Sequence, residues 1–570
     1  MIEIFVEGKQ PKRTIELTVI AQDPSVKAGG RIVTAVVKIL AEHLLPGPLG
    51  HRIRVVDYDA TKRALRAPGP LGQADDLTVT DRFAKASDRT LVGDVDFHAQ
   101  NVFAIAARTL DHFESALGRR VPWSFREHQL YVVPHAFEEA NAFYSEEDHA
   151  VFFGYFEDVD GKTAYSALSH DVVAHETTHA ILDGLRARYA LPGLPDQPAF
   201  HEAFADIVAL LSVFSVQGVV ENLLGTASKS GRIKSASVTD EDLRQTALVR
   251  LAEQLGESIR GTRTGLRDSV NLPTGAGWKD LDEFREPHRR GEVLVAAVMR
   301  ALLHIWTGRL EAITTDPTVD RARVAEEGAK AADHLLGMAI RAVDYCPPVE
   351  FEFEDFLDAL LVADQEMDPD DAFGYRAAVE HAFNEYGIER PETPTIDVLH
   401  DRLVYSGFNY TSLRSSPDEV FRFIWENRAT LRLDPTIYTF VENVRPSTRV
   451  GPDGFVVNEV LVDYVQSLRG RPDEIAKRLG PSFELPASLP ADKEIQIWGG
   501  GVLIFDQFGR AKLHQRKAID EPLRQSARLR YLADQGLRDR QGRVGFSLGI
   551  GAGQRFAELH ANATRSPEAW

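Results

Sequence analysis

Apolar positions follow different periods in successive parts of the chain. In residues 1–93, short runs such as TIELTVIA and HRIRVVDYD alternate apolar and polar positions between Gly/Pro turns, which predicts strands. Residues 94–117 carry apolar side chains at helical spacing and predict a long amphipathic helix. The runs LYVVP and AVFFGYF then predict further strands. From residue 200 to 388 the period is helical almost throughout, and the predicted helices cover residues 241–258, 290–310, 319–344, 353–365 and 371–386.

This change of period predicts an α+β fold in which a sheet-rich lobe packs on a helical lobe, with a cleft along their junction. The expected division is an N-terminal strand-rich region at 1–93, a sheet lobe at 94–199 and a helical lobe at 200–388. A Pro-rich linker follows at 389–397, and an additional α+β module occupies 398–570. That module mixes helical pieces with the strand pairs FVVNEVLVDYVQ and EIQIWGGGVLIFDQFGRAKLHQRK. Substrate recognition, oligomerisation and covering of the cleft all remain open as its role.

The predicted helix at 171–186 contains the run His-Glu-Thr-Thr-His. His175 and His179 stand one turn apart on one face, so two imidazoles can reach a single ion. Zinc in a hydrolytic site takes about three protein ligands and keeps one position for water. Glu176 leans to the side of the two histidines, where it can take a proton from that water.

The third ligand must come from another segment, and Glu202 in FHEAFADIVALLSVF is the obvious donor. Asp206 lies one turn after Glu202 and can orient a ligand histidine. The plainer alternative is that the two histidines merely pack on an apolar helix. Burying His, Glu and His together would be very unfavourable unless a cation compensated, so the residues favour one zinc ion per chain.

These motifs resemble the thermolysin-like metallopeptidases of the gluzincin group. DVVAHETTHAILDGL is similar to the active-site helix of that family, and HEAFADIVALL to its second helix, where His201 stands at a position usually held by Asn. The resemblance covers about residues 95–390. It implies a two-lobed thermolysin-like peptidase with the zinc helix between a mixed-sheet lobe and a helical lobe.

The resemblance also implies residues that act on the substrate. Asn141 and Ala142 match the edge strand that pairs with the substrate backbone. His288 and Tyr189 match the two residues that stabilise the oxyanion, and an upstream carboxylate from the acidic run before His288 can keep its imidazole protonated. Each has a plainer alternative, since a loop Tyr can be a packing residue and a His before two Arg can simply begin a helix.

A substrate-carbonyl arginine is implied too, with Arg267 as the nearest match and Arg260 and Arg263 as competitors. Asp171 matches a position that helps bind calcium in secreted members, but the position of its glutamate partner is Val213. A calcium site needs oxygen ligands, so calcium is not expected and Asp171 is predicted to cap the helix instead.

The composition of the chain limits which binding partners and which cellular compartment are expected. The 570 residues include one cysteine, Cys346, so no intrachain disulfide can form. The net charge of −20 argues against nucleic-acid binding. The N-terminus lacks the order of a signal peptide, and no apolar run approaches the length of a membrane span. We therefore expect a cytoplasmic protein without membrane or nucleic-acid partners, whose oligomeric state the sequence leaves open.

The predicted function is hydrolysis of peptide bonds in a peptide or protein substrate, with Glu176 as the general base. The alternative is a non-catalytic scaffold that keeps the peptidase fold and is stabilised by zinc. Glu176 argues against the scaffold, because a scaffold does not need a base. An aminopeptidase-like member would need an acidic anchor for the substrate amine, and the Gly-Ala-Met-Glu-Asn type of segment that serves there is missing.

Overall fold

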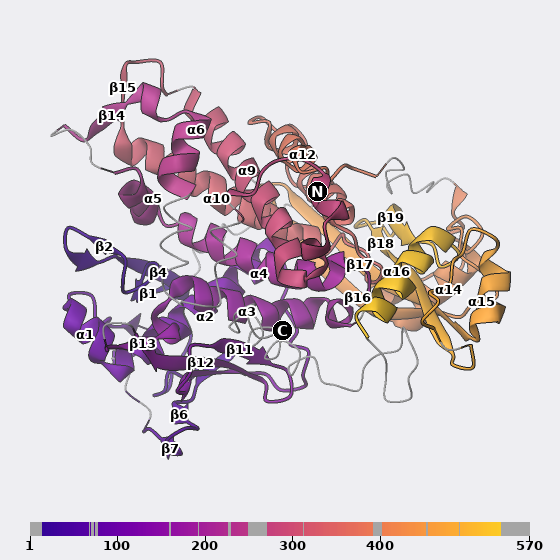
Figure 1. Cartoon of the computed structure of the whole chain (residues 1–570), viewed down its shortest axis with the longest axis horizontal. Helices are drawn as coiled ribbons and strands as arrows, with labels where there is room; N and C mark the ends of the chain where they lie inside the picture. Colours follow the sequence, from indigo (N-terminus) through magenta and orange to yellow (C-terminus); the bar gives the residue numbers. More distant parts are fainter. Residues whose placement is uncertain are drawn as a thin grey trace, which may run out of the picture.

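The architecture described here is that of a computed structural model, in which a sheet lobe, a helical lobe and a C-terminal sheet pack against one another (Figure 1). The structure describes residues 14–536 except 68, 70–72, 75–77, 159–160, 192, 226–229, 249–268, 270, 312, 392–401, 452–453 and 490.

The first part of the chain forms small antiparallel pairs, as the alternating pattern predicts. β1 (Thr14–Ile20) pairs with β4 (Thr34–Leu40), and its inward side chains Ile15, Leu17 and Val19 are buried. The shorter pairs are β2 (Lys27–Ala28) with β3 (Arg31–Ile32), β6 (Tyr58–Asp59) with β7 (Ala64–Leu65), and β8 (Gln73–Ala74) with β9 (Thr78–Val79). A short helix, α1 (Asp88–Gly93), then leads into α2 (Val95–Leu117), the predicted amphipathic helix.

A mixed sheet forms the framework under the active-site helix. Its strands are β5 (Ile53–Val55), β10 (Leu130–Phe137), β11 (Ala142–Ser145), β12 (Ala150–Glu157) and β13 (Thr163–Tyr165). The order is β11-β12-β10-β5, with β10 parallel to both neighbours and β11 antiparallel at one edge. β10 and β12 read as nearly continuous apolar runs because both faces are covered. β5, from the region predicted at 1–93, thus pairs with a strand of the region predicted at 94–199.

The helical lobe is built around a helix that is buried on all sides, α4 (Asp196–Phe214). α4 packs against α3 (His170–Leu185), the helix that carries the two histidines, and against α9 (Pro287–Glu311). The other helices of the lobe are α5 (Gln217–Leu223), α6 (Asp240–Leu243), α10 (Arg321–Val343), α11 (Phe353–Gln365) and α12 (Tyr375–Glu385). A π-helical turn (Arg244–Leu248) follows α6, and the rest of the helix predicted at 241–258 lies outside the described residues. Two strands far apart in the chain, β14 (Arg232–Lys234) and β15 (Thr318–Asp320), form an antiparallel pair in this lobe.

The C-terminal part contains a four-stranded antiparallel sheet in the order β16-β17-β18-β19. Its elements are α13 (Tyr410–Leu413), α14 (Pro417–Glu426), β16 (Thr439–Val450), β17 (Val456–Gly470), α15 (Pro472–Leu479), β18 (Ile495–Phe505), β19 (Ala511–Lys517) and α16 (Pro522–Asp534). The two predicted strand pairs correspond to β17, β18 and β19. Most of the predicted linker lies outside the described residues.

The C-terminal sheet shares its core with the rest of the chain. Leu461, Val502, Ile504 and Leu513 belong to the same buried cluster as the helices around α4. β16 also reaches α2, where the Ser447 hydroxyl donates to the carbonyl of Leu117 over 2.7 Å. The sheet is therefore packed onto the catalytic region rather than merely tethered to it.

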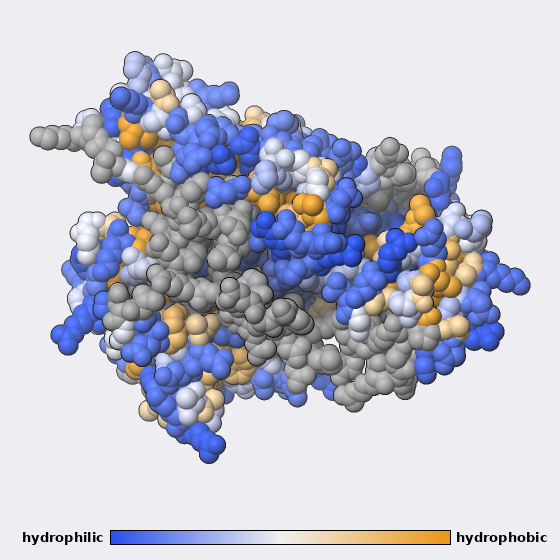
Figure 2. All heavy atoms as spheres, in the orientation of Figure 1, coloured by the Kyte–Doolittle hydropathy of each residue, from blue (hydrophilic) through white to orange (hydrophobic). Residues whose placement is uncertain are grey.

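Apolar side chains reach the surface only in small separate patches on the face shown in Figure 2. Among the described residues, one helix, α9, is long and apolar enough to cross a membrane, and the bent pair of α4 and α5 would pass the same test if it counted as one span. In α9, 72% of the most apolar window is buried inside the structure. Core helices of globular proteins share these properties.

Candidate metal centre

The two histidines of the motif face each other within the interior. α3 is buried along almost its whole length, and the Nε2 atoms of His175 and His179 lie 2.9 Å apart. The helix begins at His170 with Ser169 at the N-cap position, so Asp171 is a buried first-turn residue. The prediction that Asp171 caps the helix is wrong by two positions.

The carboxylate of Glu202 completes the group from α4. Its Oε2 lies 3.7 Å from Nε2 of His175 and 3.6 Å from Nε2 of His179, and all three side chains are buried. Ligand atoms bound about 2.0–2.1 Å from a tetrahedral zinc ion lie about 3.4 Å from each other. Burial lowers the pKa of His179 and favours the neutral imidazole, which is the form that binds a metal. The spacing and the donor set of this triad therefore fit one zinc ion.

The second ring nitrogen of each ligand histidine, Nδ1, points away from the triad and contacts a residue of α4. Nδ1 of His175 lies 2.7 Å from Oδ1 of Asp206, one turn beyond Glu202. Nδ1 of His179 lies 2.8 Å from Nδ1 of His201. Burial lowers the pKa of His201 well below its ordinary range, so its neutral ring can accept a hydrogen bond from the His179 N–H. Both contacts leave Nε2 of each ring turned toward Glu202, where the triad would hold an ion.

His201 is the residue of this centre for which the sequence predicted no role. The available signal was its place directly before Glu202, where an Asn is usual in the family that the sequence resembles. An imidazole nitrogen, like an amide oxygen, can accept a hydrogen bond from a ligand histidine.

Glu176 lies beside His175 on α3 and is almost completely buried. Burial lowers the pKa of the His179 imidazole, and the negative charges of Glu202 and, less strongly, of Glu176 partly offset that effect. A carboxylate this close to the two histidines is within the centre, where a base must be to take a proton from a bound water.

The side chain of His288, in the first turn of α9, lies beside the same metal centre. Its Nε2 lies 3.5 Å from Oε2 of Glu202, and its Nδ1 lies 2.8 Å from Oε1 of Glu286. Burial alone would raise the pKa of Glu286, but the hydrogen bond and charge of His288 outweigh it and hold the pKa below its ordinary value. Glu286 is therefore the upstream carboxylate that holds the His288 ring.

Close packing of α9 on α4 brings His288 to this position. Gly291 faces α4, where a Cβ atom would lie only 2.9 Å from the carbonyl oxygen of Ala199 and 3.3 Å from Cβ of Ala203. A side chain at this point would separate the two helices.

Tyr189 does not take part as predicted. It lies in a short 3₁₀ turn (Ala187–Ala190) that leads the chain back into the core after α3. Its ring packs on Phe200 and Phe351, and its buried hydroxyl donates to the carbonyl of Pro347 over 2.8 Å. A hydroxyl committed inside the core cannot also donate to a substrate oxygen, so the oxyanion role predicted for Tyr189 is wrong.

The predicted substrate strand lies at the edge of the mixed sheet. Ala142 begins β11, and Asn141 precedes it with its Oδ1 accepting the backbone N–H of Ala142 over 2.9 Å. β11 pairs with β12 along one side, and α3 packs against β11. Arg267 and its competitors Arg260 and Arg263 lie outside the described residues.

An HExxH helix with a glutamate from the following helix defines the metal centre of a zinc hydrolase. Residues 52–183 match the family Thermolysin metallopeptidase, catalytic domain. The match runs from β5 to the last turn of α3 and includes His175, Glu176 and His179, and the fold adds Glu202 from beyond it. The chain therefore carries a thermolysin-family metallopeptidase catalytic domain with a triad that fits zinc. No curated protein gives a significant match to this chain.

Proposed function

We propose that this chain is a zinc-dependent endopeptidase that cleaves internal peptide bonds of peptide or protein substrates. The observation that carries the proposal is the meeting of the buried His175, His179 and Glu202 with a base, Glu176, and a hydrogen-bond donor, His288. Metal ligands alone suit a scaffold as well as an enzyme, whereas a base and a donor beside them are needed only for catalysis.

Each residue has a defined task in this reaction. Zinc, when bound by the triad, lowers the pKa of a coordinated water and polarises the scissile carbonyl. Glu176 accepts the proton of the attacking water and passes it to the leaving nitrogen. His288 donates from Nε2 to the carbonyl oxygen as negative charge develops there, while Glu286 holds the ring from the other side.

The edge position of β11 supports an extended substrate. A peptide can add to the open side of β11 through backbone hydrogen bonds, with Asn141 and Ala142 at the start of the strand. Backbone pairing of this kind can bind an internal segment of the substrate peptide and does not require a free terminus. For this reason we propose an endopeptidase rather than an enzyme that removes terminal residues.

We also propose that the enzyme acts in the cytoplasm, without membrane or nucleic-acid partners, and needs no calcium. Its one cysteine, Cys346, is buried, and its thiol donates to the carbonyl of Ala342. Val213 is buried in α4 and offers no oxygen to a cation at the position that the resemblance connects with calcium.

The direct test is cleavage of a quenched peptide library together with zinc analysis of wild type and Glu176→Gln. Because the substitution removes the base but no ligand, we expect the variant to keep its zinc and lose nearly all turnover. Loss of zinc in Glu176→Gln would mean that Glu176 is a ligand. Zinc-loaded wild type that cleaves no member of the library would favour the scaffold.

A further inference from the structure

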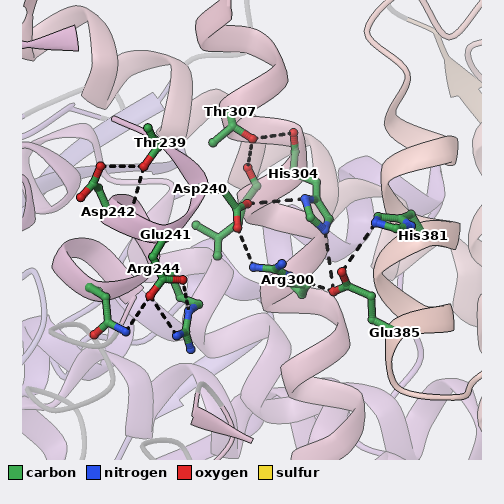
Figure 3. A network of polar contacts seen from close by, with 12 residues as sticks. Thr239, Asp240, Glu241, Asp242, Arg244, Arg300, His304, Thr307, His381 and Glu385 are labelled. Atoms are coloured by element: carbon green, nitrogen blue, oxygen red, sulfur yellow. Dashed lines mark hydrogen bonds and ion pairs between the residues drawn. The ribbon is translucent and has the colours of Figure 1, made fainter. Parts of the chain in front are cut away.

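A second group of metal-binding side chains lies on the helical lobe, away from the catalytic centre. In the described part of the chain, His304 of α9 and His381 and Glu385 of α12 bring one potential ligand atom each within 4.8 Å of one another. Both imidazoles are directed at the Glu385 carboxylate (Figure 3). His304 follows His288 by four and a half turns on the same helix, which is roughly 24 Å.

The distances from the two imidazoles to the carboxylate in this second group are close to those in the catalytic triad. Nε2 of His381 lies 3.6 Å from Oε1 of Glu385, one turn away on α12, and Nε2 of His304 lies 3.9 Å from Oε2 of the same carboxylate. The nitrogen–oxygen distances in the catalytic triad are 3.6 and 3.7 Å. Both nitrogen–oxygen distances are within about 0.5 Å of the separation of about 3.4 Å found between ligand atoms around tetrahedral zinc, and all three ligand atoms lie within 4.8 Å of one another.

A carboxylate stands behind one imidazole here, as in the catalytic centre. Oδ1 of Asp240 lies 3.5 Å from Nδ1 of His304, which leaves Nε2 turned toward Glu385. Asp206 takes the corresponding place beside His175 at the catalytic triad, at the shorter distance of 2.7 Å. Such an outer carboxylate fixes the ring and increases the basicity of a ligand histidine.

The local charge also suits a cation. Arg300 donates from Nη1 to Asp240 over 2.6 Å and from Nε to Glu385 over 2.8 Å (Figure 3). Two carboxylates and one guanidinium leave a net negative charge beside two imidazoles. The Arg300 bridge explains the two acidic residues without a metal, but it does not explain why two histidines converge on Glu385.

We propose that His304, His381 and Glu385 bind a divalent transition-metal ion, of which zinc is the expected one. Two imidazole nitrogens and one carboxylate oxygen suit zinc and its neighbours in the first transition series and are a poor set for calcium or magnesium. The His381 side chain is 67% exposed, so the ion can exchange with solvent and keep water in its remaining positions. The bound ion joins α9 to α12 and has no part in the peptidase reaction, so the proposal does not rest on that activity.

The test is the zinc stoichiometry of the full chain, first stripped with a chelator and then dialysed against buffered zinc. Wild type is expected to bind two zinc ions and His381→Ala one. Asn384→Ala is the matched control, because Asn384 is an exposed residue on the same helix outside the group, and it is expected to bind two. His175→Ala should lose the other ion, and peptide cleavage should persist in His381→Ala.

Equal zinc content in wild type and His381→Ala would overturn the proposal, whether that content is one ion or two. Loss of the second ion in Asn384→Ala as well would also overturn it, because the loss would then follow from disturbance of α12 rather than from removal of a ligand. Turnover that falls together with the second ion would overturn its assignment as a site without a catalytic part.

Discussion

The two ligand histidines each contact, through Nδ1, a partner residue, and the two partners differ in charge. Asp206 presents a carboxylate to His175, whereas His201 presents a neutral ring to His179. A carboxylate partner increases the basicity of a ligand imidazole more than a neutral acceptor does, because it stabilises the positive charge that the ring gains on binding. His175 is therefore the more strongly supported of the two ligands.

The substitution Asp206→Asn should reduce zinc binding at the metal centre without abolishing it. The amide oxygen can still accept the His175 N–H but carries no charge, so zinc affinity or turnover should fall by about 10–100-fold. Zinc titration and peptide hydrolysis of the same preparation measure the two effects. His175→Ala is the reference, since it removes a ligand, and a loss of zinc as large in Asp206→Asn would mean that Asp206 binds the ion itself.

His288→Ala should act on the reaction rather than on the metal. Removal of an oxyanion donor lowers turnover by about 10²–10³-fold with little change in zinc content or KM. Steady-state kinetics and elemental analysis together separate this result from damage to Glu202, which lies 3.5 Å from the ring.

The neighbouring residue supplies a control for His288. Arg289→Ala removes a side chain that pairs with Glu292 and contacts the centre through no described interaction, so near-wild-type turnover is expected. Turnover of His288→Ala within a few-fold of wild type would leave the ring as a helix-start residue and assign the oxyanion to another donor.

Some site residues could be predicted from the sequence and others could not. The zinc triad could be predicted because its spacing follows from the helical period and from two adjacent motifs. Tyr189 was assigned to the oxyanion from its distance to His179 along the chain. That distance does not show whether the side chain is buried, because burial depends on the turn that follows α3. His201 received no role because only the packing of α4 on α3 brings its ring against His179.

At the scale of elements, the helices from α9 to α12 and the strands β17, β18 and β19 were predictable from apolar period alone, with ends that differ by a few residues, whereas β16 was not predicted. The position of β5 was not predictable. Its partner β10 lies far along the chain, and a parallel pairing of that kind leaves no local signal. The close approach of α9 to α4 at Gly291 was not predictable either, because a glycine in a helix has no period that identifies its neighbour.

Gly291→Ala should push α9 away from α4. The new Cβ would meet backbone of α4, so we expect destabilisation of about 1–3 kcal/mol together with reduced turnover, because His288 moves with the helix. Thermal unfolding and peptide hydrolysis measure the two effects.

Gly308→Ala in the same helix is the matched control. A Cβ at Gly308 has no neighbour within 4 Å, so the substitution should stabilise the protein by about 0.4–1 kcal/mol through the unfolded chain. Equal stability effects of the two substitutions would show that α9 and α4 tolerate separation at Gly291.

At the scale of the whole molecule, the C-terminal sheet holds the end of the active-site helix. Arg186 follows the last turn of α3, and its guanidinium lies 2.7 Å from Asp463 of β17, which also pairs with Arg445 over 2.6 Å. Burial alone would lower the pKa of Arg186, but the charge of Asp463 outweighs it and holds the pKa above its ordinary value. The position of α3, and with it the metal centre, is thus coupled to a sheet more than 250 residues away in sequence.

Asp463→Ala should therefore damage both stability and catalysis. Removing one partner of a buried ion pair leaves the buried guanidinium groups of Arg186 and Arg445 without the carboxylate that they share, which costs about 3–5 kcal/mol. Denaturant unfolding should report the loss, and turnover should fall because the end of α3 is released. Asp473→Ala is the control in the same module, since Asp473 pairs with Arg471 at the surface and should change stability by less than about 1 kcal/mol. A stability of Asp463→Ala equal to that of Asp473→Ala would show that the C-terminal sheet does not support the catalytic region.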